Sequence, residues 1–389
     1  MLTVTRALPA SNPQGSRRHA LLTLAGLGAW ALVPGTAHAK AGGQRVQLAA
    51  AWEHQGRFYI GLLTAKAGEG QPLAVRARID VPTRAHGLAV LPDGTVLAAS
   101  RRPGDWLLRW RPGHKEEPQW LWQDGERSFN GHVLPSPDGQ RLYTTETDIE
   151  TGASWVTVRD ARTLKKTADW PTHGIDAHEL IWDWRSPRGG HPTLVVANGG
   201  VPTAPETGRV KRHLERMDSS IVRLDAGTGA LLGQWRLPDP RLSLRHLAWS
   251  PDERTLGIAL QAEHDDAAAK DAAPVLALFD GQQLHTQATR GPAARRIHGY
   301  GGSIAATPAG WAVSCPRADG IATYAPEGAW QGLVPLPEVC PLAVHGGALW
   351  AGGLEASLQN TQVGPPVRHP HGPQLQGARL DNHWVLARG

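Results

Sequence analysis

The chain has 389 residues, and its 40 basic and 35 acidic side chains give a net charge of +5. Three of the arginines and none of the acids lie in the first 39 residues, which leaves 37 basic against 35 acidic residues in the remainder. This balance gives no reason to expect nucleic-acid binding, and no later apolar stretch is long enough to cross a bilayer.

The first 39 residues predict an export signal. Residues 16–22 (SRRHALL) lead into an apolar run at residues 20–33, and residues 37–39 (AHA) form a cleavage site. The run is shorter than the roughly 20 residues of a membrane-spanning helix, which disfavours an uncleaved anchor. We therefore expect export to the bacterial periplasm by the twin-arginine route and a mature domain at residues 40–389. This route often carries proteins that fold around a cofactor before transport.

A repeat organises the mature chain. The sequences HGLAVLPDG, HVLPSPDG and HELIWDW begin at His86, His132 and His178, and successive copies are 46 residues apart. A fourth copy, HLAWSPDE, begins at His246. Most copies run from an apolar strand into Pro-Asp-Gly or an equivalent, where proline fixes φ and the next residues form a tight hairpin turn. A period of this length with turn signals predicts a β-propeller.

Each repeat predicts one blade of four short strands. In the first copy the strands after His86 are expected at 95–100, 105–111 and 117–122, and two weaker copies begin at Ser303 and Leu342. Second strands of the other copies are expected at 141–146, 193–198 and 255–261. Sixteen tryptophans suit the space between facing sheets.

The last blade is split between the chain ends. Residues 46–52, 58–64 and 73–81 are expected to supply three strands, and residues 382–386 supply the innermost one. The predicted fold is therefore all-β, a single seven-bladed β-propeller closed by pairing of the N- and C-terminal strands, which removes exposed sheet edges. A β-sandwich is the alternative, and the regular period favours the propeller.

One long insertion interrupts the repeat. His178 and His246 are 68 residues apart, and the excess falls at residues 199–220, with Pro202, Pro205, Gly208 and a basic run at 209–213. Long loops on a rigid scaffold often carry binding residues. A solvated loop without a function explains the segment equally well.

Five histidines occupy equivalent positions, at the entrance to the innermost strand of a blade: His86, His132, His178, His246 and His383. Inner strands surround the channel of a propeller, so these imidazoles would form a ring suited to Cu, Zn or Fe, and Cys340 would add a soft ligand. A wide channel would keep opposite ligands from reaching one ion at about 2.0 Å. We therefore expect a multinuclear centre or a subset from neighbouring blades, such as His86, His132 and His178. Histidines that only pack between blades are the alternative.

Several charged residues lie close to these positions in the sequence. Glu146, Glu179 and Asp381 could complete a metal site or orient its imidazoles. Arg101, Arg102, Arg245 and Arg317 could bind an anion or an acidic protein surface at one rim, or form salt bridges between blades.

Two other sequence features bear on chemistry. Cys315 and Cys340 could form a disulfide in the periplasm if their Cα atoms approach within about 7 Å. The sequence has no G-x-S-x-G, phosphate-loop or H-E-x-x-H motif, and no C-x-x-C-H for covalent haem.

A set of motifs spread over the mature chain resembles a family of twin-arginine-exported bacterial proteins described only as a domain of unknown function. The motifs are RRPG at 101–104, FNGH at 129–132, LYTTE at 142–146, AHEL at 177–180, VVANGG at 195–200, LRHLA at 244–248, Gln261, GYGGS at 299–303 and VC at 339–340. The resemblance implies a periplasmic propeller encoded near imelysin-type iron-regulated proteins and a di-haem peroxidase-like oxidoreductase. Pro341, where the family tends to have glycine, and residues 212–216 depart from its pattern, which puts a site formed by that loop in doubt.

We expect a periplasmic binding or accessory protein for metal acquisition that holds copper or iron at the channel mouth. An imelysin-like or di-haem peroxidase-like protein is the expected partner. A metal-free interaction scaffold is one alternative. A metal-dependent lactonase-like or redox enzyme is another, although few acids lie at the inner-strand entrances to form its site.

Overall fold

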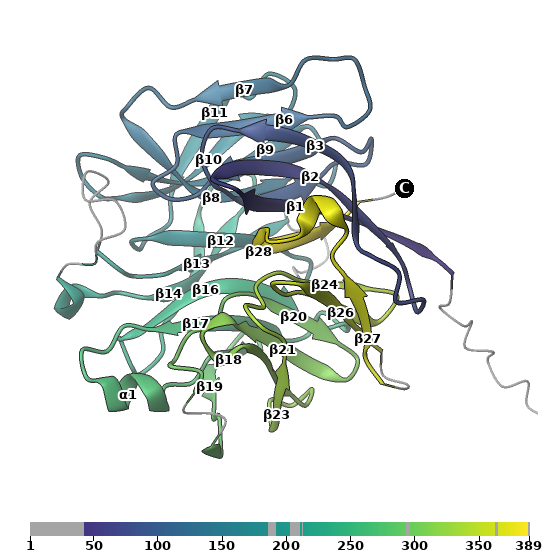
Figure 1. Ribbon diagram of the computed structural model, residues 1–389. Coiled ribbons are helices and arrows are strands. Elements are labelled where there is room, and N and C mark those ends of the chain that lie inside the picture. The colour runs from purple at the N-terminus through teal and green to yellow at the C-terminus, as the bar shows by residue number, and fades with distance from the viewer. Residues whose placement is uncertain are drawn as a thin grey trace, which may run out of the picture. The chain divides into compact units, whose positions relative to one another are not determined.

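The computed structural model of the protein describes residues 43–185, 192–202, 211, 213–292, 296–361 and 365–387 (Figure 1). The predicted export signal at residues 1–39 lies outside these ranges. In the described parts of the chain, no helix is both long and apolar enough to cross a membrane. Within the described ranges, regular helix is confined to α1 (Ala267–Ala272) and the 3₁₀ turns η2 (Leu214–Arg216), η3 (Pro316–Ala318) and η4 (Pro373–Leu375).

Strands form nearly all the regular structure, in antiparallel groups of four that follow the chain order. The first two groups are β4 (Ala85–Val90), β5 (Val96–Ser100), β6 (Trp106–Trp110) and β7 (Gln119–Trp122), then β8 (Arg127–Pro135), β9 (Arg141–Asp148), β10 (Ser154–Asp160) and β11 (Lys166–Pro171). The next two are β12 (Ala177–Asp183), β13 (Thr193–Asn198), β14 (Ser220–Asp225) and β15 (Leu231–Trp235), then β16 (Leu242–Trp249), β17 (Leu256–Ala262), β18 (Leu276–Phe279) and β19 (Leu284–Gln287). A fifth comprises β20 (Ile304–Thr307), β21 (Gly310–Cys315), β22 (Gly320–Tyr324) and β23 (Trp330–Pro335).

The remaining strands form one eight-stranded sheet that contains both ends of the described chain. It joins β24 (Leu342–His345), β25 (Ala348–Gly352), β26 (Ala356–Asn360) and β27 (Val367–Pro370) to β28 (Arg379–Leu386), β1 (Arg45–His54), β2 (Arg57–Lys66) and β3 (Ala74–Val81). β28 pairs antiparallel with β1 and meets β24 at a parallel bridge between His383 and Leu342. Figure 1 shows the purple β1 beside the yellow β28. The pairing expected between the N- and C-terminal strands is therefore present.

The first strand of each group contacts the first strand of the next. β28 contacts β4, β4 contacts β8, β8 contacts β12, and the series continues through β16, β20 and β24 back to β28. The predicted all-β, propeller-like fold is confirmed, because the strands form repeated four-stranded antiparallel sheets whose innermost members are neighbours.

The core consists of apolar layers between neighbouring sheets. In one layer Val156 and Val158 of β10 pack with Trp182 of β12 and Leu194 of β13. The alternating strand pattern sends one set of side chains to each face, so a sheet can pack against the sheets next to it. Stacked sheets fix the positions of the inner strands, and this determines where the side chains at their entrances lie.

Trp106 of β6 shows how the predicted tryptophans serve this core. Its ring is fully buried, packs edge-on against Trp120 and donates an indole hydrogen bond of 2.7 Å to Oγ1 of Thr83. We expect Trp106→Ala to lower the free energy of unfolding by about 3–5 kcal/mol, because it leaves a large cavity and an unpaired hydroxyl. Trp122→Ala, at a ring that is 53% exposed in the same sheet, is the matched control and should cost less than about 1 kcal/mol. Equal losses in urea unfolding of the two variants would contradict this assignment of the core.

Candidate metal centre

A β-bulge occurs at the entrance of five inner strands, and each bulge contains one of the predicted histidines. The register shifts fall between Ala85 and Leu88, Phe129 and Val133, Ala177 and Leu180, Leu244 and Leu247, and Leu380 and Trp384. A bulge leaves residues unpaired and re-aims their side chains. The sequences HG, NGH, HE, RH and DNH in these bulges place His86, His132, His178, His246 and His383 off the regular ladder.

The bulges of β4 and β8 cross so closely that only glycine fits. A Cβ on Gly87 would lie 2.3 Å from the carbonyl oxygen of Gly131, and one on Gly131 would lie 2.9 Å from Cδ2 of His86. Gly131 also has a φ of +101°, which residues with a side chain rarely adopt. These two glycines let the imidazoles of His86 and His132 approach each other.

The five imidazoles form a compact cluster, which we call the histidine cluster. Ring centroids of neighbouring members are 4.5–5.5 Å apart, with His246 and His383 the closest pair. Nε2 of His178 lies 3.4 Å from Nε2 of His246. One nitrogen from each of His86, His132, His246 and His383 lies within 4.8 Å of the other three.

These separations fit metal coordination. Two imidazole nitrogens bound to one ion at about 2.0–2.1 Å are about 3–4 Å apart, so the His178–His246 pair has this spacing already. The nitrogens of His86, His132, His246 and His383 lie within 4.8 Å of one another, so they must move somewhat closer together to bind one ion. Five inner strands contribute histidines to the cluster, more than the subset of neighbouring blades that we considered, such as His86, His132 and His178. The bulges bring these residues within reach of one another.

The cluster holds buried nitrogen atoms without hydrogen-bond partners. Nε2 of His86, His132 and His383 and Nδ1 of His178 are buried and make no hydrogen bond. Burying a polar atom without a hydrogen-bond partner costs about 1–3 kcal/mol. A metal ion bound by these nitrogens would remove that cost.

The imidazoles are held in the neutral form that binds metals. Burial, aided by the neighbouring histidines, lowers the pKa of His86, His132 and His178 well below its usual value. Burial likewise lowers the pKa of His246 to about 3 and that of His383 to about 4. Neutral imidazole suits Cu, Zn and Fe.

Two carboxylates, Glu179 and Asp381, contact imidazoles of the cluster. Oε2 of Glu179 lies 3.2 Å from Nδ1 of His246 and accepts a 2.8 Å hydrogen bond from the backbone N–H of Leu247. Oδ1 of Asp381 lies 3.4 Å from Nδ1 of His86. Contacts of this type fix the ring and leave the other nitrogen for the metal.

Glu179→Ala is expected to weaken metal binding by about 10–100-fold without abolishing it, because His246 loses the group that orients its ring. Glu179→Gln, whose amide oxygen can still accept from Leu247, should lose less. Competition with a chromophoric chelator measures both affinities. A loss no larger than that of the exposed control Glu253→Ala would show that Glu179 does not support the ring.

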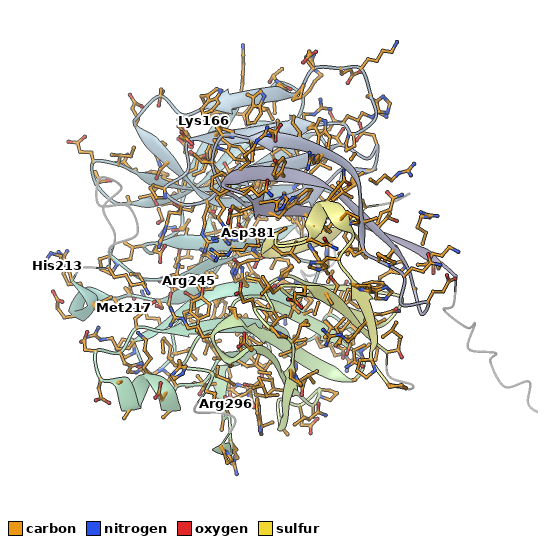
Figure 2. The ribbon with its side chains drawn as sticks, in the orientation of Figure 1. Lys166, His213, Met217, Arg245, Arg296 and Asp381 are labelled. Atoms are coloured by element: carbon orange, nitrogen blue, oxygen red, sulfur yellow. The ribbon has the colours of Figure 1, made fainter. Side chains whose placement is uncertain are left out.

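A cavity of about 490 Å³ adjoins the cluster. Its walls combine three histidines with cationic, amide and aromatic side chains, namely His86, His178, His246, Arg101, Arg102, Lys211, Arg245, Arg317, Asn130, Gln261, Asn382, Tyr300 and Pro316. Figure 2 shows Arg245 and Asp381 toward the middle of the molecule. The four arginines expected at one rim therefore line one space.

The arginines of the cavity form ion pairs within the fold. Nη1 of Arg101 lies 3.2 Å from Asp381, and Nη1 of Arg245 lies 2.9 Å from Asp176, with which Arg102 also pairs. Arg317 instead stacks over the ring of Tyr300 at 4.2 Å. Anion binding and salt bridges were the two alternatives for these four arginines, and Arg101, Arg102 and Arg245 form salt bridges.

Other predicted residues lie outside this cavity. Glu146 is buried within its blade, where it accepts a 2.7 Å hydrogen bond from Arg159. Cys340 lines a separate cavity of about 220 Å³ with Arg84, and burial raises the pKa of its thiol to about 12. Cys340 is not part of the converging group, which consists of His86, His132, His246 and His383. Cys315 and Cys340 are both free.

The insertion at 199–220 is described only in part. Pro205, Gly208, Arg209 and Arg212 lie outside the described residues. Lys211 reaches the cavity and pairs with Glu263.

Sequence reasoning missed Asp176, which joins Arg102 to Arg245. A signal was available, because Asp176 precedes His178 by two residues just as Asp381 precedes His383. The sequence also gave no indication that Lys211 and Tyr300 line the same cavity. They are far apart in the chain, and only the fold brings their two segments together.

Solved structures with the same architecture define the class of the fold. The chain is similar to Kuenenia stuttgartiensis hydrazine synthase, with a TM-score of 0.54, 16% identity and coverage of 76% of this chain and 89% of that one. It is also similar to the Dos1 propeller, with a TM-score of 0.51, 8% identity and coverage of 82% and 81%. The periplasmic gluconolactonase PpgL of Pseudomonas aeruginosa gives a TM-score of 0.50 at 15% identity, covering 74% and 80%. Likeness at these identities shows a propeller-like fold and no activity.

The family follows from a match that covers most of the chain. The model for the family described as "Protein of unknown function (DUF1513)" matches residues 79–387, and the chain belongs to this family. The resemblance to a domain of unknown function is thereby confirmed. None of the curated proteins compared with the chain matches it significantly.

Proposed function

We propose that this protein is a periplasmic metal-binding protein in which the histidine cluster at the mouth of a seven-bladed propeller holds a copper or iron ion. The observation that carries the proposal is the convergence of one nitrogen from each of His86, His132, His246 and His383, together with a buried Nε2 without a hydrogen-bond partner on His86, His132 and His383. A histidine with a purely structural role can pair a ring nitrogen with a backbone carbonyl, as Nδ1 of His369 does with Gln71.

The seven-bladed ring is part of this proposal. Two lines support it: the contacts between first strands return from β24 to β28 and β4, and β28 completes a fourth strand for β1, β2 and β3. A closed ring would hold the five bulges at fixed distances, which favours a preformed site over one assembled by the metal.

His86, His132, His246 and His383 are the residues that would hold the ion, with His178 within reach of His246. Glu179 and Asp381 fix two of the rings, and burial keeps all five imidazoles unprotonated. A copper or iron ion in such a site would supply either tight storage or one-electron chemistry. The chain's own contribution is to bind the ion and limit the access of water to it.

The periplasmic address and the partner complete the proposal. Export by the twin-arginine route would let the propeller fold around its ion before transport. An imelysin-like or di-haem peroxidase-like protein, implied by the family resemblance, would receive the ion or deliver it in metal acquisition.

Elemental analysis of protein purified from the periplasm tests this function. We expect close to one equivalent of copper or iron per chain, either as isolated or after reconstitution of the metal-free protein. Metal far below stoichiometry after reconstitution with copper, iron and zinc would overturn the proposal. Unaltered metal content in a protein lacking four of the five histidines would do the same.

A further inference from the structure

The five members of the histidine cluster differ in how they meet the cavity of about 490 Å³ beside it. His86, His178 and His246 form part of the cavity wall, whereas His132 and His383 are not among its wall residues. His86 and His246 are nevertheless buried, with 3% and 2% of their surface exposed, while His178 is partly exposed. His178 is therefore the member of the cluster that is most open to a solute in the cavity.

The contacts between the rings place His178 at one end of the cluster. His86, His132 and His246 each have ring contacts with the other four members. His178 and His383 each contact those three, and in the described part of the chain no ring contact joins His178 to His383. These two rings flank a central group of three, and of the two only His178 lines the cavity. The cavity therefore meets the cluster at the end where His178 lies.

His178 also stands outside the converging group of His86, His132, His246 and His383. Its Nε2 lies 3.4 Å from Nε2 of His246, which belongs to that group. Two imidazole nitrogens at this spacing can bind the same ion at about 2.0–2.1 Å. The His178–His246 pair is thus a two-ligand site between the cavity and the converging group.

One bulge supplies His178 and also the carboxylate that holds its partner in the pair. His178 and Glu179 lie in the bulge of β12, between Ala177 and Leu180. Oε2 of Glu179 lies 3.2 Å from Nδ1 of His246, which leaves Nε2 of that ring facing His178. Nδ1 of His178 has no hydrogen-bond partner. One ring of the pair is thus fixed by a carboxylate, and no such contact opposes rotation of the other.

We propose that His178 is an entry ligand, through which a metal ion passes between the cavity and the converging group. An ion that arrives through the cavity first binds Nε2 of His178 and Nε2 of His246. It then exchanges His178 for His86, His132 and His383, one bond at a time. His246 stays bound throughout, because it belongs both to the pair and to the converging group. The same steps in reverse release the ion. This inference rests on the proposed function and adds the route by which the site is loaded and emptied.

Stopped-flow absorbance after mixing copper(II) with the metal-free, full-length mature protein tests the inference. A chase of the loaded protein with EDTA, at concentrations where the rate no longer depends on EDTA, gives the dissociation rate constant. We expect His178→Ala to lower the association and dissociation rate constants by about 10-fold or more, because it removes a ligand that is used only during passage. The dissociation constant should change by less than about 3-fold, since both rates fall together.

His132→Ala is the matched control, because His132 belongs to the converging group and is not a wall residue of the cavity. Its association rate constant should stay within about 3-fold of that of the unaltered protein, while faster dissociation lowers the affinity by at least about 100-fold. Circular dichroism of both variants checks that they fold.

The outcomes separate this inference from the proposed function. An affinity that falls as far in His178→Ala as in His132→Ala, with an unchanged association rate, would make His178 a permanent ligand and overturn its role in entry. Unchanged rates in His178→Ala would also overturn it, because the ion would then enter by another route. Both results leave the metal site intact. If the unaltered protein binds no copper, the proposed function itself fails, and the entry ligand fails with it.

Discussion

Replacing His246 with alanine is expected to lower the affinity of the protein for copper(II) by at least about 100-fold. His246 lies in the converging group of four histidines, and its Nε2 is also 3.4 Å from Nε2 of His178. Its loss therefore removes a ligand whether the ion is bound by the group of four or by the His178–His246 pair. Loss of a residue that only orients a ligand typically costs 10–100-fold in affinity, and loss of a ligand should cost more.

The control for this variant is His285→Ala, which removes an exposed imidazole from β19, outside the cluster. Chelator competition with circular dichroism on both variants separates loss of binding from loss of folding. Copper affinity that falls equally in the two variants, or in neither, would mean that the cluster is not the binding site.

Metal binding should raise the thermal unfolding midpoint by about 4 °C at a free metal concentration 100 times the dissociation constant. Binding to the folded state alone adds about 2.7 kcal/mol under these conditions. Spread over the unfolding entropy of a domain of roughly 350 residues, this gives a shift of about 4 °C. The site exists only in the folded chain, because its ligands come from five strands that span residues 85–386.

Addition of a chelator should reverse the shift, and His246→Ala should show none of it. Differential scanning calorimetry with and without metal measures both effects. A shift of the same size in His246→Ala would assign the stabilisation to metal bound elsewhere on the surface.

The propeller-like fold was predictable because it repeats. A period of 46 residues, apolar strands and Pro-Asp-Gly turns recur at His86 and His132, and local chemistry of this kind fixes hairpins without knowledge of the rest. The β13 strand was predicted at 193–198 and lies there, whereas β1 and β2 extend beyond the predicted ends because they pair with each other along their full length.

The approach of the histidines could be predicted only in part. Equivalent positions indicated a ring, but the sequence gives no measure of how far a bulge carries a side chain inward. The glycines at 87 and 131 let His86 and His132 approach each other, and their role depends on two strands that meet only in the fold. Lys211 was missed for the same reason, since its ion pair with Glu263 depends on a tertiary contact.

The most direct test of the metal site is a crystal structure of copper-loaded protein with anomalous data collected above and below the copper absorption edge. The account predicts one strong anomalous peak within about 2.0–2.2 Å of nitrogen atoms from at least three of His86, His132, His178, His246 and His383. A peak at Cys340 or on the surface, with the histidine nitrogens bound only to water, would contradict it.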